Sequence, residues 1–408
     1  MNSSPCVSNP RPVPPSRGSA CARVRSRARQ PLRLVWHALA LVVLLAGVAC
    51  APDGGADGDD RADRGAMALA LDAPPGDDAS GSSSPNTPEP PPTIGLDSLL
   101  LEEAYERAAS LPRLYSLLVA RHGEMVREEY FNGTTPGRIA NIKSASKSVI
   151  STLVGIAIDQ GHLEGLDQPI APFFPEWTSQ NGDRRIDEIT IEHLLAMQSG
   201  LQSTSFGNYG AWAASSNWVR DQLTRPFVDE PGGAMVYSTG STHLLSAILT
   251  QATGRSTLAY ARDVLFGPMG ISLSPWTRDP QGIYMGGNEM GLRPREMLTY
   301  GELYRRGGVH EGERLLAEEW IERSWIQRGT SSFNGHGYGL GWWIRDRRGY
   351  DVYFAWGYGG QYVFVVPELE MTVVTTSNPT GPRAGGHTRA IHDTVTDLLI
   401  PAAERGAR

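Results

Sequence analysis

Lysine is scarce in this sequence. Lysine and arginine together number 37, yet only Lys143 and Lys147 are lysines, and the other 35 are arginines. A GC-rich genome would produce such a bias by itself, but arginine cannot lose its proton in a protein. A lysine that persists against this bias is therefore a candidate for a position where an ammonium group must be able to deprotonate.

The sequence also has no excess of positive charge, and it has no cysteine after residue 50. The formal net charge is −7, which argues against a protein that binds nucleic acid. The three cysteines, Cys6, Cys21 and Cys50, all lie in the first 50 of the 408 residues. The remainder can form neither a disulfide framework nor a cysteine zinc site, and no metal or organic cofactor is predicted.

Residues 1–50 have the character of an export signal. They hold seven arginines and no acidic residue, with an apolar run from Leu34 to Ala49. This pattern is typical of a secretory signal, and the run is short for a membrane span. The ending Ala49-Cys50 resembles a bacterial lipoprotein signal, in which Cys50 would be lipidated, although Gly47 stands where leucine is usual. An ordinary signal cleaved near Ala49, an uncleaved anchor and a miscalled start remain open.

The signal predicts an exported protein. We expect a cell-envelope lipoprotein in the outer membrane or periplasm, or otherwise a secreted protein, with membrane contact only through the lipid on Cys50. Residues 51–93 are rich in Asp, Gly, Ser and Pro, a composition that cannot bury enough surface to offset the entropy of ordering. They are predicted to be a disordered linker, and residues 94–408 to form one folded domain without an internal repeat.

The domain has strand patterns at both ends. Helices are expected over residues 97–110, 144–160, 190–197, 291–307, 317–323 and 387–399. Strands are expected over residues 114–119, 125–131, 350–356, 361–366 and 371–376. This order predicts an α+β fold, with one antiparallel sheet built from both chain ends, flanking helices and an inserted, mostly helical region.

Ser144 and Lys147 stand three residues apart at the start of an apolar helix, so their side chains share one helix face. A serine hydroxyl becomes an effective nucleophile when a base takes its proton, and a buried lysine with a lowered pKa can be that base. The helix N-terminus also favours negative charge that develops on a substrate. Alone, the pattern arises often by chance. Lys143 points in a different direction, and its role is left open.

Three further stretches accompany this pair. They are residues 190–201, residues 237–245, which begin Tyr237-Ser238-Thr239, and residues 356–361, which read Trp-Gly-Tyr-Gly-Gly-Gln. Their order and spacing resemble the serine β-lactamase and penicillin-binding-protein superfamily over about residues 97–400, with support from residues 338–342. The resemblance points to its class C-like branch of esterases and 6-aminohexanoate-dimer hydrolases.

The resemblance implies a β-lactamase/transpeptidase-like fold and a role for each motif. Ser144 would form an acyl-enzyme, with Lys147 as its base. Tyr237 would pass protons to the leaving group and activate the water that hydrolyses the acyl-enzyme, provided that a cation such as Lys147 lowers the pKa of the phenol. The backbone N–H groups of Ser144 and of the Gly359-Gly360 turn, most directly Gly360, would form the oxyanion hole.

Departures from the family pattern bear on the substrate. The Y-x-N asparagine is replaced by Thr239, whose hydroxyl can still donate to a substrate carbonyl over a shorter reach. The K-T-G lysine is replaced by Gly357, followed by Tyr358, and Trp356 is not a cation that could hold a substrate carboxylate. These changes favour an ester or amide that needs no carboxylate over a β-lactam.

Aromatic residues near the motifs are expected to wall an apolar cleft, although each is equally explained as an ordinary core or surface residue. Tyr209 and Trp212 lie in a Gly/Ser-rich loop that could act as a lid. The other candidates are Phe206, Trp218, Trp342, Trp343 and Tyr358. His193 could be mistaken for a triad histidine, but we expect it to have a structural role in its helix.

The leading hypothesis is a serine hydrolase that cleaves a small-molecule ester or amide through an acyl-enzyme on Ser144. One alternative is a β-lactamase or a D-Ala-D-Ala carboxypeptidase. Another is a non-catalytic envelope lipoprotein that uses the fold to bind peptidoglycan or a partner. The sequence leaves the natural substrate and the oligomeric state open.

Overall fold

The computed structural model describes residues 94–381 and 386–406. All of these belong to the second of two compact units of the chain, residues 84–408. The predicted export signal, the linker and Cys50 lie outside the described residues. Among the residues that are described, no helix combines the length and the apolar character needed to cross a bilayer.

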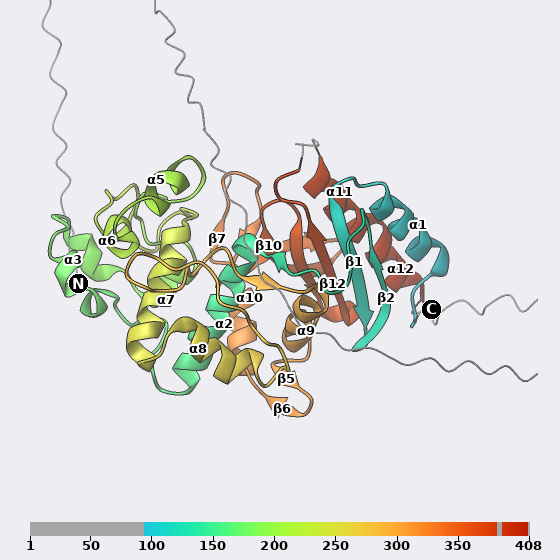
Figure 1. The fold of residues 1–408 in the computed structure, drawn as a ribbon, viewed down its shortest axis with the longest axis horizontal. Coiled ribbons are helices and arrows are strands. Elements are labelled where there is room, and N and C mark those ends of the chain that lie inside the picture. The colour runs from blue at the N-terminus through green and yellow to red at the C-terminus, as the bar shows by residue number, and fades with distance from the viewer. Residues whose placement is uncertain (1–93, 382–385, 407–408) are drawn as a thin grey trace, which may run out of the picture. The chain divides into compact units, whose positions relative to one another are not determined.

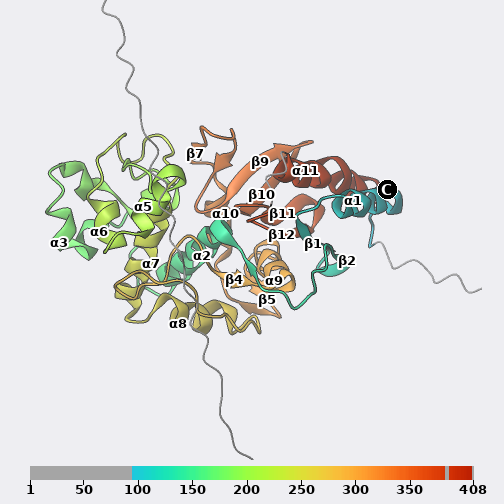
Figure 2. The same ribbon diagram turned by 45° about the horizontal axis from the view of Figure 1, so that its top comes forward.

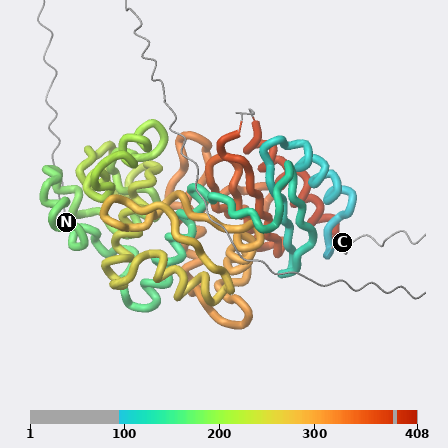
Figure 3. Tube along the Cα trace, viewed as in Figure 1, coloured from blue at the N-terminus to red at the C-terminus, as the bar shows by residue number. Residues whose placement is uncertain are grey.

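One antiparallel sheet joins the two ends of the described chain (Figure 1). Strands β1 (Leu114–Arg121) and β2 (Glu124–Tyr130) form a hairpin, and β1 then pairs with β12 (Met371–Ser377), with Leu118 opposite Val374. The strand order is β2-β1-β12-β11-β10-β9-β8-β7. Figure 3 shows the same arrangement, with the blue-green N-terminal strands beside the red C-terminal ones.

The remaining strands complete this sheet and two short ladders. The sheet also contains β7 (Gly329–Thr330), β8 (Gly337–Tyr338), β9 (Trp343–Arg347), β10 (Tyr350–Gly357) and β11 (Gln361–Val366). The ladders pair β3 (Ala140–Asn141) with β4 (Gly291–Leu292) and β5 (Val309–His310) with β6 (Glu313–Arg314).

Helices cover the sheet, and most of them lie in the part of the chain between strand β2 and strand β7. They are α1 (Ser98–Ala109), α2 (Ser146–Asp159), α3 (Pro175–Thr178), α4 (Ile191–Leu195), α5 (Tyr209–Ala213), α6 (Trp218–Leu223), α7 (Thr239–Thr253), α8 (Thr257–Ala261), α9 (Pro294–Arg305), α10 (Glu318–Trp325), α11 (His387–Thr394) and α12 (Ile400–Gly406). The 3₁₀ turn η1 (Lys143–Ala145) precedes α2, and a π-helical turn, Val395–Leu399, joins α11 to α12.

The sheet separates two hydrophobic cores because alternate side chains of a strand point to opposite faces. On one face, residues such as Val119 and Val373 pack with α1 and the C-terminal helices. On the other, Leu118 and Val374 join the core that contains α2, α7 and α9. Figure 2 shows α1 and α11 on one side of the sheet and α2 and α9 on the other.

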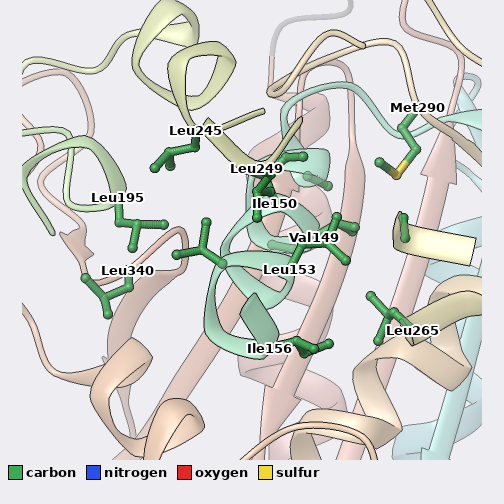
Figure 4. Packing of buried hydrophobic residues seen from close by; sticks show 14 of the residues in the cluster. Val149, Ile150, Leu153, Ile156, Leu195, Leu245, Leu249, Leu265, Met290 and Leu340 are labelled. Carbon is green, nitrogen blue, oxygen red and sulfur yellow. The ribbon is translucent and has the colours of Figure 1, made fainter. Parts of the chain in front are cut away.

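Helix α2 lies inside the larger core. Every residue from Ser146 to Ala157 is buried, and the hydroxyls of Ser148 and Ser151 donate to the carbonyl oxygens of Gly341 and Leu340 within the core. Figure 4 shows Leu153 and Ile156 of α2 among side chains from other elements, including Leu195 and Leu245. The residues at the start of α2 are therefore held by a rigid, fully packed element.

The expected α+β fold, with its sheet built from both chain ends and its inserted helical region, is confirmed. Helix α1 begins after Asp97, whose side chain accepts hydrogen bonds from the N–H groups of Leu99 and Leu100. The pattern did not single out α7 or β9, and it ended the C-terminal helix too early, because the π turn carries the chain directly into α12.

Gly155 of α2 allows close packing against α10. A Cβ atom at this position would lie 2.4 Å from Cδ2 of Trp320. We therefore expect Gly155→Ala to lower the free energy of unfolding by about 1–2 kcal/mol, since the overpacking cost exceeds the gain in helix propensity. Gly210→Ala in α5 is the matched control, because open space surrounds that glycine. Urea titration measures both, and equal stability of the two variants would contradict this reading.

Candidate active site

The start of α2 brings Ser144 and Lys147 together. Ser144 lies in η1 and Lys147 in the first turn of α2, and Nζ of the lysine is 3.2 Å from Oγ of the serine. The lysine is 1% exposed. The pair expected from the spacing is thus in contact, with its amine removed from solvent.

The amine of Lys147 has two further neighbours. The carbonyl oxygen of Gly287 lies 2.6 Å from Nζ, and Oγ1 of Thr239 lies 3.3 Å from it. Burial lowers the pKa of Lys147 to about 7. A neutral amine has two N–H donors and one lone pair. With the two N–H groups donated to Gly287 and Thr239, the lone pair faces the hydroxyl of Ser144, which is the arrangement that a base requires.

Tyr237 also lies next to Lys147. The centroid of its ring is 5.1 Å from Nζ of Lys147. Burial raises the pKa of Tyr237, and the nearby side chain of Ser144 only partly opposes the rise. The expectation that a cation lowers this pKa is therefore wrong. At neutral pH, Tyr237 remains a phenol that can pass a proton but does not act as a phenolate.

Thr239 does not face the substrate side of the site. Its hydroxyl contacts Lys147 and lies 2.9 Å from Oγ of Ser205, and the residue is 4% exposed. The expected bond from Thr239 to a substrate carbonyl does not fit this placement. Its position instead suits a residue that holds the amine of Lys147.

An open cavity of about 390 Å³ lies over Ser144. Apart from the serine, its lining is aromatic: Phe206, Tyr237, Phe333, Trp343, Trp356 and Tyr358. Nothing in this lining carries a positive charge. The cavity suits an uncharged, apolar group next to the serine hydroxyl.

The aromatic residues predicted from the sequence divide into two groups. Phe206, Trp343 and Tyr358 do line this cavity, as expected. Three predicted tryptophans are instead buried in the core, away from the cavity: Trp212, Trp218 and Trp342. Tyr209 also lies outside the lining, where its hydroxyl accepts a hydrogen bond from Asn288 at 2.9 Å. Phe333 was missed, because its Ser/Asn/Gly-rich loop has no pattern that marks it.

The turn after β10 does not place its glycines as expected. The N–H of Gly360 donates to the carbonyl oxygen of Gly357 at 3.3 Å. Gly360 packs toward Ser377, Gly359 packs toward Pro379, and neither lines the cavity. The Gly360 assignment is therefore corrected, because its donor is used within the turn.

Tyr358, unlike the two glycines, belongs to the lining of the cavity. Within the described residues, no hydrogen bond from its backbone N–H to another backbone carbonyl is found. Gly357 lets β10 come this close, because a Cβ there would lie 2.0 Å from the carbonyl oxygen of Ile142. The end of β10 therefore packs against the start of η1, the turn that carries Ser144.

The second lysine of the chain is also accounted for. Nζ of Lys143 lies 2.9 Å from Oε1 of Glu289, and Oε2 of the same carboxylate accepts a hydrogen bond of 2.6 Å from Asn141. Glu289 follows the segment that presents Gly287 to the amine of Lys147. The ion pair therefore ties that segment to the residues that lead into Ser144.

His193 has the structural role predicted for it. It belongs to a capping box at the start of α4, in which Nδ1 of the ring accepts the N–H of Thr190 while the threonine hydroxyl accepts the N–H of His193. Over residues 94–381 and 386–406, no group of three or more His, Cys, Asp or Glu side chains is placed to hold a metal ion.

Comparison with known proteins identifies the family of the chain. The family model described as Beta-lactamase matches residues 113–396. The chain belongs to the beta-lactamase family. It is therefore a member of a family of serine hydrolases, within the wider superfamily that also contains the penicillin-binding proteins.

Individual relatives are distant. The 6-aminohexanoate-dimer hydrolase of Paenarthrobacter ureafaciens is 23% identical over 346 residues, which cover 78% of this chain and 84% of the relative. The solved structure of EstCE1, a hydrolase with promiscuous acyltransferase activity, has a TM-score of 0.59 at 18% identity and covers 73% of this chain and 98% of its own. The D-amino acid amidase of Ochrobactrum anthropi SV3 has a TM-score of 0.57 at 17% identity, over 76% and 97%. These structures share the fold.

The state of the Lys147 amine predicts a pH dependence. The neutral amine is the form that can take the serine proton, so kcat/KM for an ester should rise with pH through one ionisation near 7. Lys147→Arg keeps a positive charge but cannot deprotonate, and should lose about 10³-fold or more at every pH. A pH–rate profile tests both, and an active arginine variant would exclude Lys147 as the base.

The Lys143–Glu289 pair predicts a coupling in stability. Both side chains are partly exposed, at 21% and 29%, so solvent screens them and the pair should contribute about 0.5–1 kcal/mol. We expect Lys143→Gln and Glu289→Gln each to lower the melting temperature, and the double variant to lose less than the sum of the two. Strict additivity in this double-mutant cycle would show that the two charges do not interact.

Proposed function

We propose that the protein is a serine hydrolase that cleaves an uncharged ester or amide through an acyl-enzyme on Ser144. The observation that carries the proposal is the environment of the Lys147 amine. Its nitrogen lies 3.2 Å from Oγ of Ser144 and has two other acceptors, Thr239 and Gly287, and burial lowers its pKa to about 7, so the neutral amine can keep its lone pair for the serine proton.

In the first half of the proposed reaction, Oγ of Ser144 bonds to the carbonyl carbon of the substrate, and its proton passes to Nζ of Lys147. The carbonyl oxygen becomes an oxyanion, to which we assign the backbone N–H groups of Ser144 and Tyr358 as donors. When the bond to the leaving alcohol or amine breaks, the lysine proton passes to the leaving atom by way of the Tyr237 hydroxyl. A phenol with a raised pKa suits this relay, since it gives up one proton only as it accepts another.

In the second half, water replaces the leaving group. Its oxygen bonds to the acyl carbon, and one of its protons passes through Tyr237 and Lys147 to Oγ of Ser144 as the acyl bond breaks. The products are a carboxylic acid and the free serine. No metal or organic cofactor enters these steps.

The lining of the cavity supports an uncharged substrate over a β-lactam. Trp356 and Tyr358 lie on the side where the family pattern has a lysine, and both lysines of the chain are used elsewhere, in contacts with Ser144 and Glu289. A substrate carboxylate would enter an aromatic cavity without a cation, which costs several kcal/mol of desolvation. A peptidase or β-lactamase activity is therefore the weaker alternative.

Active-site labelling tests the proposal. A fluorophosphonate probe should modify Ser144, and the protein should hydrolyse p-nitrophenyl butyrate. Ser144→Ala should abolish labelling and lower turnover by about 10³-fold or more, since the nucleophile is lost. Ser146→Ala is the matched control, because that hydroxyl donates to the carbonyl oxygen of Lys143 and touches none of the reacting atoms.

The outcomes separate the alternatives. Hydrolysis of a chromogenic cephalosporin, or stable acylation by penicillin, in place of ester turnover would favour the β-lactamase or peptidase alternative. If the probe does not label the protein and no substrate is turned over, the non-catalytic binding protein is favoured. A comparison of p-nitrophenyl butyrate with the matching p-nitroanilide measures the preference between ester and amide.

A further inference from the structure

A second cavity adjoins the catalytic one. It has a volume of about 540 Å³. Its lining consists of Ser203, Phe206, Met235, Val236, Tyr237, Ser331, Ser332 and Phe333. Three of these residues, Phe206, Tyr237 and Phe333, also line the catalytic cavity. The two cavities are therefore neighbours that meet at these three rings.

Two of these rings come from separate loops. The ring centroids of Phe206 and Phe333 are 5.3 Å apart, and each is 6.0 Å from the centroid of Tyr237. Phe206 belongs to the turn before α5, and Phe333 to the loop between β7 and β8. The contact between Phe206 and Phe333 thus joins two segments that are far apart in the sequence.

Both phenylalanines are unusual for surface residues. Phe206 is 65% exposed and Phe333 is 46% exposed, and Phe206 has a φ of +55°, a conformation that is unfavourable for a bulky side chain. Exposed apolar side chains that gather at one place mark a binding surface. Strain retained at such a place is consistent with a functional position for the Phe206 ring.

We propose that the second cavity is the binding site for the leaving group of the substrate. The proposal rests on the hydrolase function proposed above. The acyl carbon must lie at Oγ of Ser144 in the catalytic cavity, whereas the leaving atom must come within hydrogen-bond reach of the proton relay at Tyr237. Tyr237 lines both cavities, so a substrate group that continues beyond the leaving atom passes the Phe206–Phe333 pair and enters the second cavity.

The lining indicates the chemistry of that group. Met235 and Val236 supply aliphatic surface, the serines supply hydroxyl groups, and no lining residue carries a charge. The hydroxyl of Ser203 already donates to the carbonyl oxygen of Tyr237 at 2.7 Å. The leaving group that fits is an uncharged primary alcohol or amine with an aliphatic chain, while the acyl group occupies the aromatic cavity.

Two series of esters, followed by acid release in a pH-stat, test the proposal. The first holds the butanoyl group constant and lengthens the alcohol from methyl to butyl to octyl. The second holds methanol constant and lengthens the acid from butanoic to octanoic. In the native protein, kcat/KM should rise by about tenfold or more from methyl to butyl butanoate, as apolar surface is buried in the second cavity.

Ser332→Trp fills the second cavity from an exposed loop position. In this variant, kcat/KM should no longer rise with the length of the alcohol, whereas its dependence on the length of the acid should persist. Thr330→Trp is the matched control, since Thr330 is exposed on the neighbouring strand β7 and lines neither cavity. The control should retain both dependences, and a thermal melt checks that the variants are folded.

A flat response to alcohol length in the native protein would overturn the proposal, as would an equal loss on all esters in Ser332→Trp. In both of these cases fluorophosphonate labelling of Ser144 persists, so the hydrolase function stands while the leaving-group site does not. If no ester is cleaved and Ser144 is not labelled, the two proposals fall together.

Discussion

The site depends on one buried amine. Nζ of Lys147 contacts the serine in η1, Thr239 at the start of α7 and the carbonyl of Gly287, so three segments meet on a single atom. Burial lowers the pKa of this group from 10.5 to about 7. Between these values the unfolded chain binds a proton that the folded chain does not, so this residue makes folding more favourable as pH rises across that window. At neutral pH, burial of this amine therefore lowers the stability of the fold, and in return it keeps a neutral base available.

Much of this site could be read from local spacing. Ser144 and Lys147 are three residues apart on a helix, and the strands β11 and β12 are short runs rich in valine and threonine that are buried throughout. The sequence could not show how distant segments surround Tyr237. Phe206 and Phe333 come from separate loops, and their packing, with Trp343, is what buries the phenol and reverses the expected direction of its pKa shift.

The same limit explains the glycine turn. The family resemblance marked residues 356–361 as part of the site, and Gly357 brings β10 close to the backbone of Ile142. Which N–H remains free depends on the hydrogen bond inside the turn, from Gly360 to Gly357, and no sequence pattern records it. The aromatic tryptophans were ambiguous for a similar reason, since burial in the core and lining of a cavity favour the same residue types.

The two lysines also determine how residues 94–408 react with amine-directed labelling reagents. Lys147 is 1% exposed, and Lys143 is bound to Glu289 with its side chain 21% exposed, so residues 94–408 hold no freely exposed lysine amine for acylating dyes or amine crosslinkers. They contain no cysteine either. A single cysteine introduced on the surface would therefore be the one thiol of residues 94–408, to which a fluorophore or solid support could be attached at a defined position of the folded unit.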